Sequence, residues 1–147
     1  MTAVSRDLAR EQAAKDQVHE AFDAWAAGTG GPFALLAEDA TWTIVGRSPV
    51  SRTYTSRADF IGTVIEPFNA RMSERLVPTV RHLLADGDWV VVLFDAHATA
   101  RDGRPYDNTY TWYLRFDPAR ETEAIVEVIA FFDTVEFTDF WERVAPA

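Results

Sequence analysis

The sequence predicts an α+β domain in which helices near the N-terminus cover one face of a strongly curved antiparallel sheet. The first half of the chain shows helical periodicity with a short strand within it. Residues 77–135 instead contain four long alternating stretches separated by short polar turns. A chain of 147 residues can bury a sizeable core, so we expect a single domain over 1–147. A curved sheet with one covered face encloses a cone, where we expect a ligand site.

The first half of the chain supplies most of the predicted helices. A helix is expected over residues 5–27, because its apolar residues fall on one helical stripe, and the glycine-rich segment 28–31 ends it. Pro32 can occupy the first turn of a short second helix, since a residue there has no intrahelical N–H bond to lose. Alternation predicts a short strand at 41–45, and residues 46–53 form a loop.

A third helix leads into the sheet. It begins at Ser56, which can cap it, and Pro67 should kink or end it. A strand at 77–85 follows, and residues 86–87 form a two-residue turn to the next strand, which places His82 near Val91 on the face that carries Asp95. Residues 138–144 are expected to form a last turn of helix or a terminal flap.

Three consecutive strands, at 89–100, 105–116 and 124–135, are where we expect chemistry. They are apolar stretches in which acidic, imidazole, phenol and amide groups recur at alternate positions, so these groups share a face of each strand. A hairpin that closes symmetrically about residues 102–103 places three pairs opposite each other on one face: His97 with Asn108, Asp95 with Tyr110, and Leu93 with Trp112. A slip of one residue would undo this arrangement.

Asp133 ends the third of these strands after a run of large apolar residues. A carboxylate in that setting is costly unless it is hydrogen-bonded, paired or protonated, and desolvation raises its pKa toward the range of general acid–base catalysis. The alternative is that Asp133 caps the strand end in solvent. A raised pKa would indicate the catalytic role, and a depressed pKa the structural one.

Charge and composition exclude several classes of function. The formal net charge is -9 with dispersed basic residues, which argues against nucleic acid or an anionic membrane as a partner. Cysteine is absent, so disulfides, thiolate metal sites and cysteine nucleophiles are excluded. No apolar run approaches the length of a membrane span and residues 1–14 lack a leader pattern, so we expect a cytoplasmic protein.

The candidate site combines residues from several strands and one helix. Two carboxylates near an imidazole and a phenol could divide acid and base roles, because unequal burial separates their pKa values. The alternative for the aromatic, amide and imidazole members is a structural role in the core. The catalytic candidates are Asp133, Asp95, Tyr110 and His97, and the substrate-binding candidates are Trp112, Asn108, Trp42, His82, Phe68 and Phe131.

No cofactor is required for such a site, and we predict no metal. His82, His97 and the two aspartates are permissible ligands, but they lack the local spacing typical of metal sites.

Several short segments together resemble the nuclear transport factor 2-like (NTF2-like) superfamily, with its cystatin-like α+β fold. Within it the chain is most similar to the SnoaL-like group of polyketide cyclases, ketosteroid isomerases and limonene-epoxide hydrolases. The resemblance covers about residues 18–135. It rests on Phe22-Asp-Ala-Trp25, Leu35-Leu36-Ala-Glu-Asp39-Ala-Thr-Trp42, Ala85-Asp-Gly87-Asp-Trp89, Asp102-Gly103-Arg-Pro-Tyr106-Asp-Asn108 and Ile129-Ala-Phe131-Phe-Asp133.

The resemblance implies roles for the two aspartates. Asp133 matches the general base of the cyclases and one catalytic aspartate of the epoxide hydrolases, and Asp95 matches the hydrolases' other aspartate. Leu93 stands where the hydrolases have an arginine, and Ile44 stands near the position of the isomerase base. Epoxide hydrolysis and steroid isomerisation are therefore disfavoured.

We expect a cofactor-independent cyclase or isomerase acting on a small apolar carbonyl or polyketide-like compound. Asp133 would be the base, and Tyr110 or Asn108 would hydrogen-bond the enolate. The alternative is a non-catalytic ligand-binding or dimerisation module of the same fold. A homodimer is implied by the resemblance, and its predicted contact surface is the smooth face of the first long strand: Val90, Val92, Phe94, Ala96 and Ala98.

Overall fold

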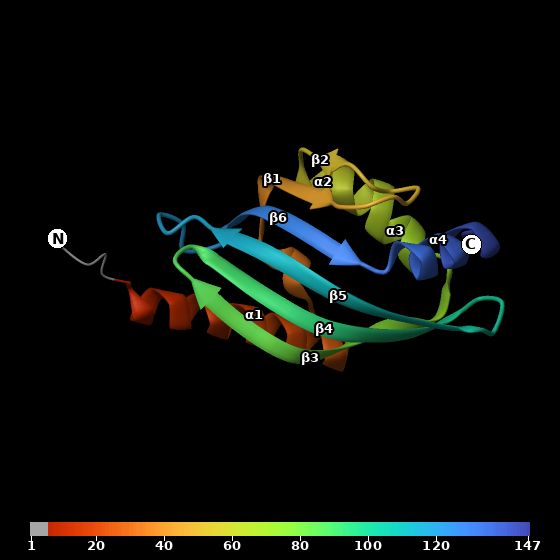
Figure 1. Cartoon of the computed structure of the whole chain (residues 1–147), viewed down its shortest axis with the longest axis horizontal. Coiled ribbons are helices and arrows are strands. Elements are labelled where there is room, and N and C mark those ends of the chain that lie inside the picture. Colours follow the sequence, from red (N-terminus) through yellow and green to blue (C-terminus); the bar gives the residue numbers. More distant parts are fainter. Residues whose placement is uncertain (1–5) are drawn as a thin grey trace.

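A curved six-stranded sheet forms the frame of the molecule, and helices cover its concave face (Figure 1). The computed structural model describes residues 6–147. The elements follow in this order: α1 (Leu8–Ala27), η1 (Pro32–Leu35), β1 (Leu36–Ile44), β2 (Thr53–Tyr54), α2 (Arg57–Phe60), η2 (Ile61–Ile65), α3 (Glu66–Asn69), β3 (Met72–Asp86), β4 (Trp89–Ala100), β5 (Pro105–Phe116), β6 (Ile125–Phe132) and α4 (Thr134–Arg143).

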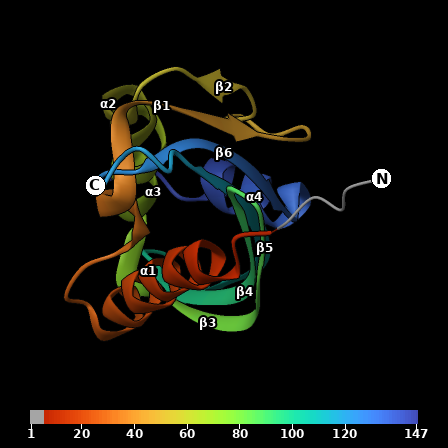
Figure 2. The same cartoon turned by 90° about the vertical axis from the view of Figure 1, so that its left-hand side faces the viewer.

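The strand order is β2-β1-β6-β5-β4-β3. All neighbouring strands are antiparallel except β1 and β6, which are parallel, so the sheet is mixed where the sequence predicted an antiparallel one. In the end-on view of Figure 2, α1 lies within the curve of β3, β4 and β5. The α+β class and the curved, helix-covered sheet are confirmed.

The predicted helices form where the sequence pattern places them. In α1 Val18 and Phe22 of the expected apolar stripe are buried, whereas Leu8 is 66% exposed, and Gly28 ends the helix in the left-handed conformation at φ 76°. Ser5, the expected start of this helix, lies outside the described residues. The Ser56 hydroxyl accepts a hydrogen bond from the Asp59 N–H at 3.1 Å, as a helix cap does. The segment that it begins continues through α2, η2 and α3.

The β4–β5 hairpin has a different register from the symmetric one. Its loop is residues 101–103, closed by a hydrogen bond from the Ala100 N–H to the Arg104 carbonyl at 2.9 Å. Gly103 has φ 86°, the left-handed conformation that a three-residue hairpin loop needs. As a result the pairs on the inner face include Phe94 with Tyr110, Val92 with Trp112 and Ala96 with Asn108.

This register corrects two predictions. Asp95 pairs with Thr109 and His97 with Asp107, both on the outer face, so the expected pairing of Asp95 with Tyr110 is wrong. The proposed dimer surface is wrong as well, because it is the inner face of β4 and belongs to the core. Its residues are at most 3% exposed: Val90, Val92, Phe94, Ala96 and Ala98.

Other differences are local. His82 pairs with Leu93 rather than lying near Val91, because the β3–β4 turn falls one residue later than expected. His82 still lies on the outer face with Asp95. The short strand β2 was predicted as loop, and α4 begins earlier than the expected last turn. None of the helices within residues 6–147 is both long and apolar enough to cross a bilayer.

Glu11 joins α1 to the β3–β4 turn. It is 4% exposed, its Oε1 accepts a hydrogen bond from the Gly87 N–H at 2.9 Å, and the Arg6 guanidinium donates to both carboxylate oxygens. These bonds, the one from Gly87 first, hold the pKa of Glu11 below its usual range. A depressed pKa in the folded state stabilises the fold above the unfolded-state pKa, about 4.3, and that stabilisation is lost as the pH falls through the folded-state pKa.

We therefore predict that Glu11→Gln lowers the melting temperature at pH 7. The difference from the wild type should shrink as the pH falls below about 4, where the wild-type carboxylate also becomes protonated. Thermal unfolding between pH 3 and 7 measures this. Glu20→Gln, at an exposed position on the same helix, is the matched control. A difference that stays constant across this pH range would contradict the role of Glu11.

Candidate functional site

An aromatic cavity of about 80 Å³ lies between the inner face of the sheet and the helices. Its walls are packed rings. Trp42 stacks on Phe60 with ring centroids 4.0 Å apart, and Trp25 stacks on Trp112 at 5.8 Å. The cavity is lined by Trp25, Phe33, Trp42, Ile44, Phe60, Val64, Ile65, Phe68, Asn69, Leu76, Tyr110, Trp112, Ala130, Phe132 and Phe137. Flat aromatic walls of this kind suit a flat, apolar ligand.

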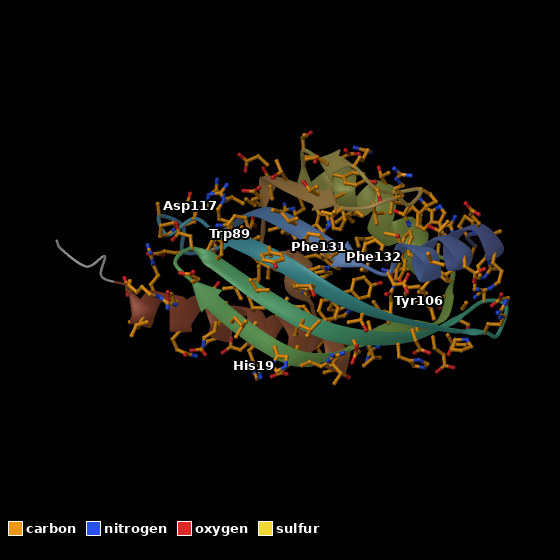
Figure 3. The ribbon with its side chains drawn as sticks, viewed as in Figure 1. His19, Trp89, Tyr106, Asp117, Phe131 and Phe132 are labelled. Atoms are coloured by element: carbon orange, nitrogen blue, oxygen red, sulfur yellow. The ribbon has the colours of Figure 1, made fainter. Side chains whose placement is uncertain are left out.

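The polar end of the aromatic cavity is Tyr110, which belongs to a hydrogen-bonded group on β5. Its hydroxyl lies 2.7 Å from the Tyr106 hydroxyl, and the Asn108 Nδ2 donates to Tyr106 at 2.8 Å. Tyr106 lies near α4 (Figure 3). Burial raises the pKa of both phenols above their usual range. Both therefore stay neutral at physiological pH and act as hydrogen-bonding groups.

Helix α4 covers one end of the aromatic cavity with Phe137, and Arg71 fixes the helix in place. The Arg71 guanidinium donates to the carbonyls of Pro67 and Val144 at 2.8 Å and of Trp141 at 3.2 Å. It also lies 3.8 Å from the centroid of the Trp141 ring. One buried cation thus joins α3 to the end of α4.

A second, polar depression lies on the outer face of the sheet, and we call it the outer groove. It has a volume of about 490 Å³ and is lined by Val77, Thr79, Asp95, Ala96, His97, Asp107, Asn108, Thr109, Asp133 and Glu136. Within residues 6–147 no group of three histidine or carboxylate side chains is arranged to hold a metal ion.

The carboxylates of the outer groove are engaged in local contacts. Asp95 accepts hydrogen bonds from the Thr109 hydroxyl at 2.6 Å and from Arg81 at 3.2 Å, and these groups lower its pKa, Thr109 having the larger effect. His97 pairs with Asp107. Asp133 caps α4, because its Oδ1 accepts from the N–H groups of residues 135 and 136 at 3.0 and 3.2 Å.

The predicted site residues therefore divide between two faces of the sheet. Trp42, Phe68, Tyr110 and Trp112 line the aromatic cavity. Asp95, His97 and Asp133 instead line the outer groove, and Asn108, whose side chain lies on the inner face of β5, also borders it. His82 and Phe131 line neither; both point to the outer face, where Phe131 is 43% exposed. The prediction of one site with Asp95 and Trp112 on the same face is wrong.

The role of Asp133 as a base stays a prediction, but its structural premise is not met. The side chain is exposed rather than desolvated, and it lies in the outer groove rather than in the aromatic cavity. Phe132, the last residue of β6, faces inward, and Asp133 follows the strand as the cap of α4.

Sequence reasoning missed several residues of the site. Trp25 and Phe60, which belong to the first and third predicted helices, were not among the candidates, although the apolar stripe of a helix that faces a curved sheet is where cavity walls lie. Tyr106 was missed because its role depends on two hydrogen bonds. Its alternation with Asn108 and Tyr110 on β5 was the available signal.

The comparisons with known proteins agree with this fold. Residues 18–134 match the model of the SnoaL-like domain, and the chain belongs to this family. No curated protein matches the sequence.

Among solved structures, Bal32a from a soil-derived mobile gene cassette is 18% identical, with a TM-score of 0.71 over 89% of this chain and 98% of that one. An NTF2-like protein from Burkholderia thailandensis E264 is 19% identical, with a TM-score of 0.68 over 86% and 95%. A candidate SnoaL-like polyketide cyclase from Jannaschia sp. CCS1 is 13% identical, with a TM-score of 0.69 over 94% and 96%. At these identities the likeness establishes a shared fold.

We predict that Arg71→Met destabilises the protein by about 2 kcal/mol, because the carbonyls at the end of α4 lose a buried charged donor. Methionine keeps most of the apolar stem, so the effect reports the hydrogen bonds. Chemical denaturation measures it, with Arg104→Met at an exposed position as control. Equal stability of the two variants would show that Arg71 does not hold α4.

Proposed function

We propose that this protein binds a small, planar and largely apolar molecule in the aromatic cavity. The observation that carries the proposal is the chemistry of the walls. Among the described residues that line the cavity there are aromatic and aliphatic side chains, Asn69 and Tyr110, but no carboxylate and no imidazole. A charged ligand would lose its hydration there without gaining a partner, whereas a flat apolar ligand would stack on the rings.

Ligand size follows from the surroundings of the cavity. Its volume of about 80 Å³ is smaller than the roughly 150 Å³ of an engineered apolar cavity that holds benzene. A neighbouring depression of about 380 Å³ shares Trp25, Asn69 and Leu76 with it. We therefore expect the ligand to reach the cavity past these three residues and to widen it by side-chain movement.

Filling the aromatic cavity should abolish binding. Ala130 lines the cavity and is 1% exposed, so Ala130→Leu places three additional carbon atoms in the space that the ligand would occupy. We predict at least a tenfold loss of affinity for styrene, measured by quenching of tryptophan fluorescence, with stability kept or raised. Ile129→Leu, on the outer face of the same strand, is the control. Unchanged styrene binding in Ala130→Leu would place the ligand elsewhere.

A second candidate function is cyclisation or isomerisation of an apolar carbonyl or polyketide-like compound in the same cavity. The SnoaL-like family includes polyketide cyclases and isomerases. The specific observation in its favour is Tyr110, a neutral phenol in apolar surroundings, which could stabilise charge developing on a carbonyl oxygen. The walls would contribute by holding a flexible substrate in a reactive conformation.

Two substitutions test this second candidate. If Tyr110 acts on the carbonyl, Tyr110→Phe lowers turnover at least tenfold. Asp133→Asn should leave turnover and melting temperature nearly unchanged, because asparagine caps a helix as well as aspartate does. A loss of about a hundredfold in Asp133→Asn, with stability retained, would instead establish Asp133 as the general base.

We also propose a homodimer, formed through the outer face of the sheet rather than through the inner face of β4. Leu84, Tyr113 and Phe131 are 61%, 38% and 43% exposed on this face, next to half-buried Leu93 and Ile129. A second copy of this chain suits this surface because the charges on it already occur as pairs of opposite sign, such as Arg115 with Glu127. A twofold axis can therefore bring the same surface of two copies together without leaving charges of one sign unpaired.

We expect sedimentation at micromolar concentration to show a dimer that buries on the order of 1,200 Å² in total. The double substitution of Tyr113 and Phe131 by glutamate should give a folded monomer, because four carboxylates would face one another across the twofold axis. Glutamate substitutions at exposed Gln17 of α1 and at Thr29 just after it, where the helix covers the opposite face of the sheet, should leave the dimer intact. A monomeric wild type would contradict the proposal.

A further inference from the structure

The orientation of the Asn108 side chain is fixed by backbone groups that cannot change their roles. Its Oδ1 accepts from the N–H groups of Thr109 at 2.8 Å and Asp133 at 3.1 Å, and its Nδ2 donates to the carbonyl of Asp133 at 3.1 Å. A flipped amide would place its NH₂ against two donors and its oxygen against an acceptor. Asn108 is only 6% exposed, so such a mismatch could not be relieved by solvent. The second hydrogen of Nδ2 therefore points at Tyr106.

This orientation sets the direction of the next hydrogen bond. The Tyr106 oxygen accepts from Asn108 at 2.8 Å, and its side chain is completely buried against the rings of Phe68 and Phe140. Within residues 6–147 the other polar group beside the Tyr106 hydroxyl is the Tyr110 hydroxyl, at 2.7 Å. A buried hydroxyl hydrogen without an acceptor is costly, so Tyr106 donates to Tyr110.

Tyr110 is thus the last member of a directed chain, Asn108 to Tyr106 to Tyr110. Its oxygen already accepts a hydrogen bond, so its own hydrogen is free to be donated. Tyr110 is also the member of this chain that lines the aromatic cavity. A ligand atom that meets this hydroxyl in apolar surroundings binds best if it is an acceptor.

We propose that the ligand of the aromatic cavity presents a hydrogen-bond acceptor, a carbonyl or ether oxygen, to the Tyr110 hydroxyl, and that Asn108 and Tyr106 act as positioning residues that set this direction. The inference rests on the proposed binding function and adds the chemical class of the ligand to it. Cooperative polarisation along the chain strengthens the final hydrogen bond. An apolar molecule of the same shape without an acceptor should bind less well than its size predicts.

Styrene and benzaldehyde are a matched pair of probes, because both are flat and they differ by a vinyl group against a carbonyl. The ratio of their affinities is compared between wild type and Tyr110→Phe, which cancels the cost of removing each probe from water. We expect the preference for benzaldehyde to fall roughly tenfold in Tyr110→Phe. The infrared carbonyl stretch of bound benzaldehyde should lie at lower frequency in the wild type than in this variant.

Asn108→Asp tests the direction of the chain. The new carboxylate accepts where the amide donated, so Tyr106 turns its hydrogen toward residue 108, and Tyr110 then donates to Tyr106. The lowering of the benzaldehyde carbonyl stretch, which we call the carbonyl shift, should disappear although Tyr110 is intact. A merely structural role of Asn108 would not produce this effect.

If this variant does not fold, Tyr106→Phe tests the direction of the chain instead. A carbonyl shift in both wild type and Tyr106→Phe supports the proposal, whereas a shift in Tyr106→Phe alone overturns it.

The remaining outcomes separate this inference from the function on which it rests. If both probes bind the wild type but their affinity ratio and the carbonyl stretch are unaffected by Tyr110→Phe, the binding function stands and the acceptor class is wrong. If neither probe binds the wild type, and Ala130→Leu changes nothing, the proposed function itself fails.

Discussion

The register of the β4–β5 hairpin determines what each face of this sheet can do. The loop of residues 101–103, with Gly103 at positive φ, leaves Phe94, Tyr110 and Trp112 facing the helices. Side chains alternate along a strand, so a shift of one residue would exchange the two faces and place Asp95 inside. The aromatic cavity, the hydrogen-bonded chain that ends at Tyr110 and the charged outer groove all depend on this one loop.

The two faces have opposite electrostatic character. The inner face encloses rings and two neutral phenols, while the outer face holds ionised carboxylates such as Asp95, which is stabilised by Thr109 and Arg81. Because no carboxylate, imidazole or cationic side chain is among the described residues that line the cavity, its chemistry is limited to orientation, exclusion of water and hydrogen bonding. In a low-dielectric interior a single directed hydroxyl is a stronger recognition element than it would be in water.

Sequence patterns predicted the helices, the long strands and the fold, because stripes and alternation report burial directly. Trp42, Phe68 and Trp112 were placed correctly in the cavity for the same reason. The hairpin register could not be predicted, since Asp102-Gly103 is compatible with more than one loop length. Nor could the start of α4 directly after Asp133, where the first N–H groups of the helix donate hydrogen bonds to its carboxylate. The contacts of Tyr106 with its two partners likewise exist only in the folded chain.

Binding of the ligand at the inner face of the sheet, and not at the outer face, is the proposal on which the others rest. Isoleucine side chains report on both, because Ile44 and Ile65 line the aromatic cavity whereas Ile129 faces outward on β6. The most direct test is the measurement of intermolecular nuclear Overhauser effects between benzaldehyde and isotope-labelled isoleucine methyl groups. Binding in the aromatic cavity predicts contacts from the aldehyde to Ile44 and Ile65 and none to Ile129. Contacts to Ile129 alone would contradict it.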